Sequence, residues 1–444
     1  MQNNLKSYNK QKILELFLLG LESTKPRNIL HKHIKLNQST LLINSPKKYI
    51  YDSFDKILPI AIGKASVEMA KSFNKLVKTE CKVSKGILIV NKENFKKIDN
   101  FKCFKSGHPL PDKEGIKATT YLIQRLQETK EDDIVILMLS GGGSAMLPYP
   151  EEGITIEEKI IVNKLLLECG ADIIEINAVR KHISKIKGGN FLKYSTPSVV
   201  HSLIISDVIG DDLSSIASGL TVPDHTTFRD VIKICKKYKI FEKIPNSVRN
   251  HLIRGESKLI PETPKKTDQV FKRCHNFIIS SNGKSIHAIK NYLDRKNLKS
   301  EISSLNIIGE VKCAAESLVK SIKEKKGPIL FLFGGETTVQ IRGNGIGGRN
   351  QEFALYFAFF MNKYCPKKKF IFLSGGTDGR DGPTDSAGGI VDETTILKCA
   401  EKKIDILSEL ANNNSYYVLK KINSHIIIGG TNTNVADIQI LLLR

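Results

Sequence analysis

The chain has 444 residues and a formal net charge of +22, with 41% apolar and 26% charged residues, which is typical of a globular protein long enough for several domains. Only 12 of the 68 basic residues are arginine, and the lysines are scattered rather than gathered in blocks, so the charge does not indicate a nucleic-acid-binding protein. No apolar segment approaches the ~18 residues that span a bilayer, and the eight cysteines include no Cys-x-x-Cys pair. We therefore expect a cytoplasmic protein without a membrane partner, a zinc site or a disulfide framework.

Strands and helices alternate through the first two-thirds of the chain. Unbroken apolar runs that end at glycine or at polar residues predict strands buried on both faces of a sheet. We expect strands at 57–62, 86–90, 134–139 and 199–205, and helices at 13–22, 64–76, 112–128, 156–169 and 173–186. This alternation predicts right-handed βαβ units and a mainly parallel sheet with helices on both faces.

The pattern weakens between 241 and 272, where proline and lysine are frequent, and we interpret this segment as a connection. A strand at 276–280 and helices from 283 and at 309–323 follow it. Apolar strands then lead into glycine-rich turns, at 329–333, 370–373 and 425–428. These changes predict three parts, an N-terminal domain at 1–260, a connecting α/β segment at 261–327 and a smaller α/β domain at 328–444.

The most informative motif is the glycine triplet that follows the apolar run 134–139. The motif consists of Ser140, Gly141, Gly142, Gly143 and Ser144. Glycines at this position leave backbone N–H groups free of side chains, and the carboxyl end of a parallel strand is where such sheets bind phosphate. We interpret the motif as a phosphate-binding loop. A tight strand-to-helix turn is the alternative, and the loop lacks the Gly-Lys-Ser/Thr end of a Walker A motif.

Charged side chains follow two other predicted strands. Lys64 comes after Gly63 at the start of a helix, where its ammonium group could neutralise a phosphate or a developing alkoxide. Asp207 ends the strand at 199–205, and Asp211 lies four residues further on. One carboxylate could accept a substrate hydroxyl proton and another could hold Mg²⁺. A solvated lysine and aspartate N-caps are the alternatives.

The helix predicted at 173–186 is unusually polar. Asn177 and Arg180 precede a Lys-Gly-Gly stop at 187–189, and we assign both residues to substrate or phosphate binding. A charged surface helix is the alternative.

A glycine-rich loop in the C-terminal region predicts a second anion site. Glu336 follows the strand at 329–333, and Gly347 and Gly348 precede Arg349, which opens a helix. A guanidinium group at this position can hold phosphate or carboxylate through two parallel hydrogen bonds. We therefore assign Glu336, Gly347 and Gly348 to substrate or phosphate binding.

Two further patterns are less specific. Glycines at 343, 345 and 348 satisfy a dinucleotide-type spacing, but no acid lies at the ribose position about 20 residues on. The loop at 375–385 carries three acids, and Asp378 among them predicts either a metal ligand or part of a plain turn.

In their order along the chain, these motifs resemble the glycerate 2-kinase family, the glycerate kinases that carry a MOFRL domain at the C-terminus. The resemblance covers nearly the whole chain and rests on ten segments, at 63–65, 107–109, 140–145, 177–189, 206–208, 217–219, 334–336, 347–352, 376–382 and 433–437. Two positions depart from the family pattern, which usually has proline where Leu220 stands and glycine where Asn432 stands.

The resemblance implies transfer of the γ-phosphoryl group of ATP to D-glycerate, with Mg²⁺, to give 2-phosphoglycerate. It implies a Rossmann-like, doubly wound N-terminal domain, a smaller MOFRL-type α/β domain, and an active site in the cleft between them. Lys64, Asp207 and Arg349 stand at the positions that this family is thought to use for catalysis.

One alternative function is an NAD(P)-dependent hydroxypyruvate or tartronate reductase, against which the missing ribose-binding acid argues. A basic nucleic-acid-binding protein is a second alternative, and the scattered lysines argue against it. The expected partners are D-glycerate and ATP, with no nucleic acid and no membrane, and the protein is expected to be a monomer or a homodimer.

Overall fold

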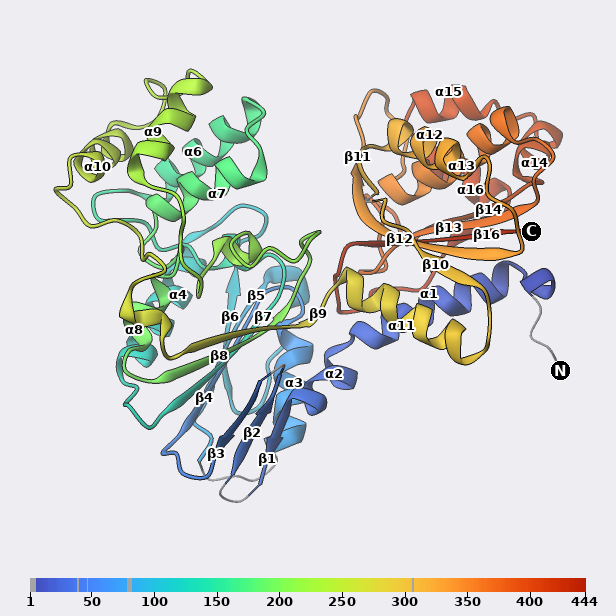
Figure 1. Cartoon of the computed structure of the whole chain (residues 1–444). Coiled ribbons are helices and arrows are strands. Elements are labelled where there is room, and N and C mark those ends of the chain that lie inside the picture. Colours follow the sequence, from blue (N-terminus) through green and yellow to red (C-terminus); the bar gives the residue numbers. More distant parts are fainter. Residues whose placement is uncertain (1–4, 38–39, 46, 78–81, 306) are drawn as a thin grey trace. The chain divides into compact units, whose positions relative to one another are not determined.

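The computed structural model describes residues 5–37, 40–45, 47–77, 82–305 and 307–444. The chain forms two compact units (Figure 1). The central unit consists of Ile29–Ile279, and the terminal unit combines Met1–Asn28 with Ser280–Arg444. None of the helices in the described ranges is long and apolar enough to cross a membrane.

The central unit contains a six-stranded sheet with the strand order β6-β5-β4-β7-β8-β9. All neighbouring pairs from β6 to β8 are parallel. This order is that of a Rossmann-like sheet, in which the chain builds outward on one side of the first strand and then on the other. The bounds of the strands are β4 Ile57–Ile62, β5 Gly86–Asn91, β6 Phe101–Ser106, β7 Ile134–Leu139, β8 Val199–Ile205 and β9 Cys274–Ser280.

The inner strands are apolar along their whole length because both faces of the sheet are covered. Every residue of β4, β5 and β7 is buried. Their side chains form a core with residues of α4, α8 and the segment around Ile216. The helices that connect these strands are α3 Ser66–Val77, α4 Lys113–Gln127, α5 Gly143–Met146 and α8 Phe191–Ser195.

Four further helices of the central unit pack around a separate apolar core, and Figure 1 shows them together at one end of this unit. They are α6 Ile156–Glu168, α7 Ile173–His182, α9 Phe228–Lys237 and α10 Asn246–Glu256. The predicted connection at 241–272 is therefore wrong in part, because it contains α10. This helix was missed because its apolar residues are few, although Val248 and Leu252 are fully buried.

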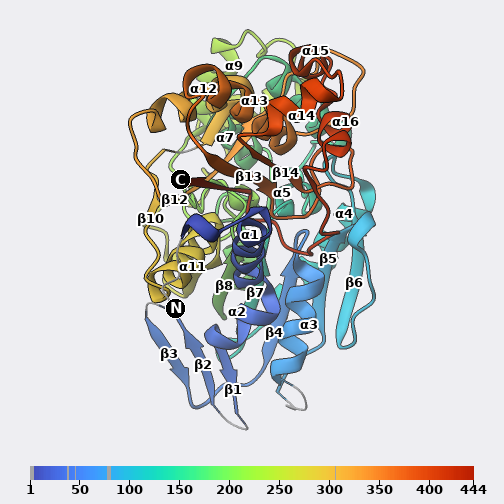
Figure 2. The same ribbon diagram turned by 90° about the vertical axis from the view of Figure 1, so that its right-hand side faces the viewer.

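A small antiparallel sheet, visible at the lower edge of Figure 2, precedes the large one. It consists of β1 Ile34–Leu36, β2 Leu41–Asn44 and β3 Lys48–Tyr51, and it follows α2 Pro26–His33. Tyr51 Oη lies 2.7 Å from His201 Nε2, and Tyr49 Oη lies 3.2 Å from His275 Nδ1. The small sheet thus packs on β8 and β9 through aromatic side chains.

The terminal unit contains a mixed sheet with the strand order β10-β12-β16-β13-β14-β15, and β11 pairs with β12 as well. Neighbouring strands are antiparallel along the path β12-β16-β13-β14-β15. Strands β10 and β11 run parallel to β12. The bounds are β10 Ser300–Ile302, β11 Ile307–Glu310, β12 Ile329–Thr338, β13 Phe370–Gly376, β14 Gly388–Asp392, β15 His425–Ile426 and β16 Asp437–Leu443.

Helices cover both faces of this sheet, because alternate strand residues point to opposite sides. Phe331, Phe333 and Phe372 face a core shared with α12 Val311–Ile322 and α13 Arg349–Tyr364. Leu330, Leu332 and neighbouring residues face α1 Lys10–Thr24 and α11 Asn282–Arg295. The remaining helices of the unit are α14 Thr395–Glu401, α15 Ile406–Ala411 and α16 Ser415–Lys421.

The predicted strands at 57–62, 134–139 and 199–205 are confirmed at the same bounds. The helix predicted at 173–186 ends at His182, and the strand predicted at 425–428 ends at Ile426. The division into 1–260, 261–327 and 328–444 stays a prediction, and it differs from the two compact units. Residues 1–28 and 280–327 belong to the terminal unit, since α1 and α11 pack on its sheet.

Seven of the eight cysteines lie among the described residues. These seven form no disulfide. Cys81 lies outside the described residues.

Candidate functional site

The predicted lysine and the glycine triplet meet at the carboxyl ends of β4 and β7. These strands are neighbours, but the chain passes through β5 and β6 on the far side of β4 before it returns to β7. Sheets of this type bind ligands where the strand order reverses in this way. The Lys64 N–H donates to the Gly141 carbonyl at 2.9 Å, and the Ala65 N–H donates to Ser140 Oγ at 3.0 Å. Ser140 thus joins the two loops and is itself buried.

Gly141 has no room for a side chain because Asp207 lies against it. A Cβ atom on Gly141 would come within 2.0 Å of Asp207 Oδ2. Burial raises the pKa of the Asp207 carboxyl, opposed by a hydrogen bond from its own backbone N–H and by the charge of Lys64. A carboxyl group with a raised pKa at the end of a central strand suits proton transfer. The structure therefore brings the predicted residues Lys64, Gly141 and Asp207 together.

His108 belongs to the same cluster, although sequence reasoning assigned it no role. Gly142 has a φ of +84°, and a Cβ atom there would lie 2.9 Å from His108 Cδ2. Burial and the charge of Lys64 lower the pKa of the His108 imidazole, while Glu93 opposes this effect. The only sequence signal was the Gly-His-Pro segment at 107–109, which follows β6.

Asn177 reaches the glycine loop through two hydroxyl groups. Ser218 Oγ donates to Asn177 Oδ1 at 2.9 Å, and it lies 2.8 Å from Ser144 Oγ. Asn177 is buried, and its Nδ2 has no hydrogen-bond partner in the described part of the chain. Gly143 also fits tightly, since a Cβ atom there would lie 3.1 Å from Ala217 Cβ. The structure thus connects Asn177 with Ser144 but gives the Asn177 amide nitrogen no acceptor.

Arg180 lies on the same helix, α7, and contacts α6. Its Nε and Nη2 donate to Asn163 Oδ1 at 2.8 and 2.5 Å. Burial lowers the pKa of the Arg180 guanidinium. Together with Ser144 and Gly142, Arg180 lines a cavity of the central unit.

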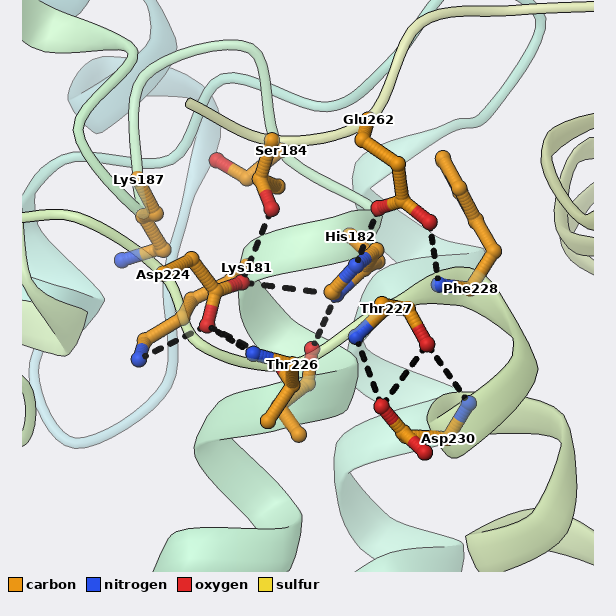
Figure 3. Close-up of polar contacts among 12 residues, drawn as sticks. Lys181, His182, Ser184, Lys187, Asp224, Thr226, Thr227, Phe228, Asp230 and Glu262 are labelled. Carbon is orange, nitrogen blue, oxygen red and sulfur yellow. Dashed lines mark hydrogen bonds and ion pairs between the residues drawn. The ribbon is translucent and has the colours of Figure 1, made fainter. Parts of the chain in front are cut away.

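The last turn of α7 is fixed by a buried polar cluster, shown in Figure 3, in which His182 lies between Asp224 and Glu262. Lys181 Nζ donates to Ser214 Oγ at 2.6 Å and to Asp224 Oδ1 at 3.4 Å. Burial raises the pKa of the Asp224 carboxyl, but the charges of Lys181 and His182 outweigh it and leave the pKa below its usual value. This cluster holds the helix that carries Asn177 and Arg180.

In the terminal unit, Arg349 is held by two carboxylates. Its Nε and Nη2 donate to Asp437 Oδ2 and Oδ1 at 2.7 and 2.9 Å, and its Nη1 lies 2.7 Å from Glu336 Oε1. Burial lowers the pKa of the guanidinium, but the hydrogen bonds and charges of Asp437 and Glu336 outweigh this and raise it. Burial likewise raises the pKa of Asp437, and Arg349 offsets part of that rise. The predicted pair Glu336 and Arg349 is thus brought together, and Asp437 was missed as their partner.

The glycine-rich loop before Arg349 is packed rather than open. Asn413 Oδ1 accepts from the N–H groups of Arg342 and Gly343 at 2.7 and 3.1 Å, and the neighbouring loop amides bond to Asn412 and Asn414. Glycine is needed at 347 and 348, because a Cβ atom there would lie 2.1 Å from Ser415 Oγ or 2.3 Å from Asp381 Cγ.

The carboxylate of Asp381 occupies the N-terminal end of α13. Asp381 accepts from the N–H groups of Asn350 and Gln351 at 3.1 and 2.8 Å. Burial and the charge of Asp437 raise the pKa of Asp381 to about 6. The sequence predicts either metal binding or a plain turn for this acidic loop, and within it Asp381 caps the start of α13.

The two predicted metal ligands lie in different units. Asp211 belongs to a turn of the central unit, and Asp378 in the terminal unit accepts from the Arg380 N–H at 3.0 Å. Within the described ranges, no group of three or more His, Cys, Asp or Glu side chains is arranged to hold a metal ion. The assignment of Asp211 and Asp378 to a metal stays a prediction.

The fold and these loops place the chain among two-domain α/β proteins with a Rossmann-like sheet. It matches the Domain of unknown function (DUF4147) over residues 12–253 and the MOFRL family over residues 329–437. Glycerate 2-kinase of Pyrococcus horikoshii is 38% identical over 96% of this chain and 95% of its own length. D-glycerate 2-kinase of Thermotoga maritima is 38% identical over 88% of this chain and 91% of its own length.

Solved structures agree with these sequence relatives. The crystal structure of glycerate kinase from Thermotoga maritima superposes with a TM-score of 0.84 at 35% identity and covers 98% of this chain and 99% of that one. A Pyrococcus horikoshii protein gives a TM-score of 0.80 at 38% identity, with 97% of each chain covered. The chain belongs to the glycerate kinase family.

Proposed function

We propose that this protein is a glycerate 2-kinase, which transfers the γ-phosphoryl group of ATP to the 2-hydroxyl group of D-glycerate to give 2-phosphoglycerate and ADP. Family membership supports the reaction class, because the relatives at 38% identity are named glycerate 2-kinases. The observation that carries the assignment to residues is the approach of Asp207 to Gly141, beside Lys64. The comparisons give no support to the reductase alternative.

In this proposal, Asp207 accepts the proton of the attacking hydroxyl group. The hydroxyl oxygen forms a bond with the γ-phosphorus while the bond between that phosphorus and the bridging oxygen breaks, and ADP leaves. Lys64 neutralises charge on the transferring group, which is the main task of protein side chains in phosphoryl transfer. The raised pKa of Asp207 supports its role as a base, because a carboxylate with a higher pKa accepts a proton more readily.

Arg349 supplies a second positive charge in this proposal. Of the five N–H donors of a guanidinium group, Asp437 and Glu336 engage three, so two remain for a phosphate or a carboxylate. The two carboxylates fix the plane of the guanidinium group before a ligand binds. The predicted cleft between the two domains stays a prediction.

Magnesium fits this proposal as the counter-ion of the nucleotide. Mg²⁺ commonly binds through one or two carboxylates together with substrate phosphates and water, so a preformed cluster of acids is not required. We propose Asp211 or Asp378 as the carboxylate for this role, and the ion would neutralise phosphate charge.

The decisive experiment is an NMR analysis of the product formed from ATP and D-glycerate. We expect phosphorus coupled to the proton on carbon 2, which defines 2-phosphoglycerate. Coupling to the carbon 3 protons would refute the choice of hydroxyl group, and ADP formation without a phosphorylated acid would refute the reaction.

The roles of Lys64 and Asp207 are tested by Lys64→Met and Asp207→Asn. Each should lower kcat by more than ~10²-fold, which is the usual effect of losing one preorganised charge. Lys71→Met is the matched control, since Lys71 lies on α3 and pairs with Glu68 at the surface. Turnover near that of the control in both variants would refute the assignment.

A further inference from the structure

A cavity of about 270 Å³ lies in the central unit beside the glycine triplet. Gly142, Ser144 and His108 line the cavity, and residues of α6 and α7 supply much of the remaining lining. Val162, Leu166 and Val179 make part of the lining apolar. The cavity is therefore continuous with the loop that carries the proposed chemistry, but most of its walls belong to residues with no role in that chemistry.

Three basic side chains line this cavity, and neutral oxygens are their hydrogen-bond partners. Lys187 Nζ donates to the carbonyl and the hydroxyl oxygen of Ser144 at 2.5 and 2.9 Å. Lys159 Nζ donates to the Ile183 carbonyl at 3.2 Å, and Arg180 donates to Asn163. Lys159 is 7% exposed and Lys187 is 2% exposed. We refer to Lys159, Arg180 and Lys187 as the basic triad.

The described residues provide no ion pair for any member of the basic triad. Among the described residues, Glu151 is the one acid whose charge acts on Lys159, and no ion pair joins the two side chains. His108, the other titratable group in the lining, is neutral or positive and cannot balance the charge. Burial lowers the pKa of Lys159 to about 7, and burial together with the charges of Lys159 and Arg180 lowers the pKa of Lys187.

A protein rarely buries basic groups without a counter-charge, because the cost of desolvation is not repaid. The missing counter-charge can come from a ligand. Three basic groups around one space match an anion with two or more charges better than a single carboxylate, and a guanidinium fork matches the oxygens of a phosphate. The volume allows more than one water molecule and suits a small ligand.

We propose that the basic triad forms a phosphoryl-anion site whose lysines take up protons from solution when the anion binds. The proposal rests on the proposed kinase function for the source of the anion, which is a phosphate group of the nucleotide or of the phosphorylated product. Without the anion, one or both lysines stay neutral. With the anion, both become ammonium groups, so that binding is coupled to protonation.

Isothermal titration calorimetry tests this coupling on the full-length protein at pH 8. Pyrophosphate, ADP, 2-phosphoglycerate and D-glycerate are titrated separately, each in two buffers of different ionisation heat. We expect uptake of about one proton or more with pyrophosphate and with whichever of ADP and 2-phosphoglycerate supplies the phosphate, and none with D-glycerate. Phosphate-ligand binding without proton uptake in the unmodified protein would refute the proposal.

The residues are tested by Lys187→Met and Lys159→Met, with Lys185→Met as the matched control, since Lys185 lines a different cavity. Each triad variant should weaken pyrophosphate binding by at least ~10-fold and lower the proton uptake, and the control should change neither. Pyrophosphate binding of equal strength in all three variants would refute a phosphoryl site. Triad variants that lose binding of D-glycerate but keep binding of pyrophosphate would refute it as well. Proton-coupled pyrophosphate binding in a protein that makes no phosphorylated acid would refute the kinase function and leave this site standing.

Discussion

Arg349 of the terminal unit and the basic triad of the central unit have their positive charges balanced in opposite ways. In the terminal unit, Arg349 has two carboxylate partners, one of them only 1% exposed. In the central unit, the basic triad has only neutral oxygens. An arginine that is already paired is held in one orientation before any ligand arrives, whereas an unbalanced triad has its counter-charge still to bind. In our proposals, the paired arginine thus serves positioning and the unbalanced triad serves ligand capture.

The largest effect should come from breaking the balanced pair. Arg349→Met leaves Asp437 buried without its partner, which typically costs about 3–5 kcal/mol of unfolding free energy. It should also lower kcat by more than ~10²-fold if Arg349 acts on the transferring group. Urea unfolding and a coupled ADP assay measure the two effects.

A double variant separates stability from turnover in this pair. Arg349→Met combined with Asp437→Asn should recover much of the lost stability, because no unpaired charge stays buried, but should not recover kcat. Arg342→Met, at an exposed arginine of the same loop, is the control and should change neither. Recovery of kcat in the double variant would assign Arg349 to structure alone.

A second difference between the units concerns pH. Glu352 on α13 is 3% exposed and accepts from Asn413 Nδ2 at 3.0 Å, and burial raises its pKa from 4.5 to about 7. The folded protein therefore holds this proton more tightly than the unfolded chain. The contribution of Glu352 to stability should be full below about pH 4.5 and should fall by about 3 kcal/mol as the pH rises to 7, at 1.4 kcal/mol for each pKa unit.

Glu352→Gln tests this linkage, because the amide cannot ionise. Urea unfolding of the variant between pH 4.5 and pH 8 should show a smaller decline than the unmodified protein. Glu409→Gln, on α15 in the same unit, is the control and should keep the full decline. An unchanged slope in Glu352→Gln would contradict the raised pKa.

The central unit should show the opposite dependence through Asp224, whose pKa is lowered in the fold by Lys181 and His182 against the effect of burial. The folded state binds this proton less tightly than the unfolded chain, so the stabilisation is present above the usual pKa of 3.8 and is lost as the pH falls below it. Asp224→Asn should cost about 2 kcal/mol at pH 7, the usual worth of charge-assisted hydrogen bonds. The variant should also lose this part of the acid sensitivity in urea unfolding at pH 3–6.

Much of the central unit follows from local sequence. Strands that are buried on both faces of a sheet appear in the sequence as unbroken apolar runs. The runs 57–62, 134–139 and 199–205 have this form, and small or polar residues follow each of them, so the strands and their ends were predictable. Lys64 and Asp207 were predictable for the same reason, because parallel strands bring their carboxyl ends to one edge. Asp437 was not, since its partner Arg349 is 88 residues away.

Features that depend on distant segments escaped prediction. Helix α1 shows a clear apolar stripe, but the sequence around it does not indicate that this stripe packs on a sheet formed by residues 329–443. Lys159 lies on a helix that is apolar on several sides, and the lysine is conspicuous only once α7 and Ser144 stand opposite it. The sequence of a Rossmann-like sheet thus predicts which residues follow the strands, but it does not predict cavities that form between distant helices.

The smallest effect on stability should come from the unbalanced triad, and it should have the opposite sign to that of Arg349. The pKa of Lys159 is lower in the folded protein than in the unfolded chain, so its charged form destabilises the fold. This cost is largest below about pH 7 and disappears as the pH rises towards 10.5. Lys159→Met removes a buried ammonium group that has no carboxylate partner and keeps a side chain of similar length. Unfolding free energy at pH 7 should therefore stay within about 1 kcal/mol of the unmodified value or rise, in contrast to the large loss for Arg349→Met. A loss of 3 kcal/mol or more would mean that Lys159 already has a counter-charge in the folded protein, and the difference between Arg349 and the basic triad would disappear.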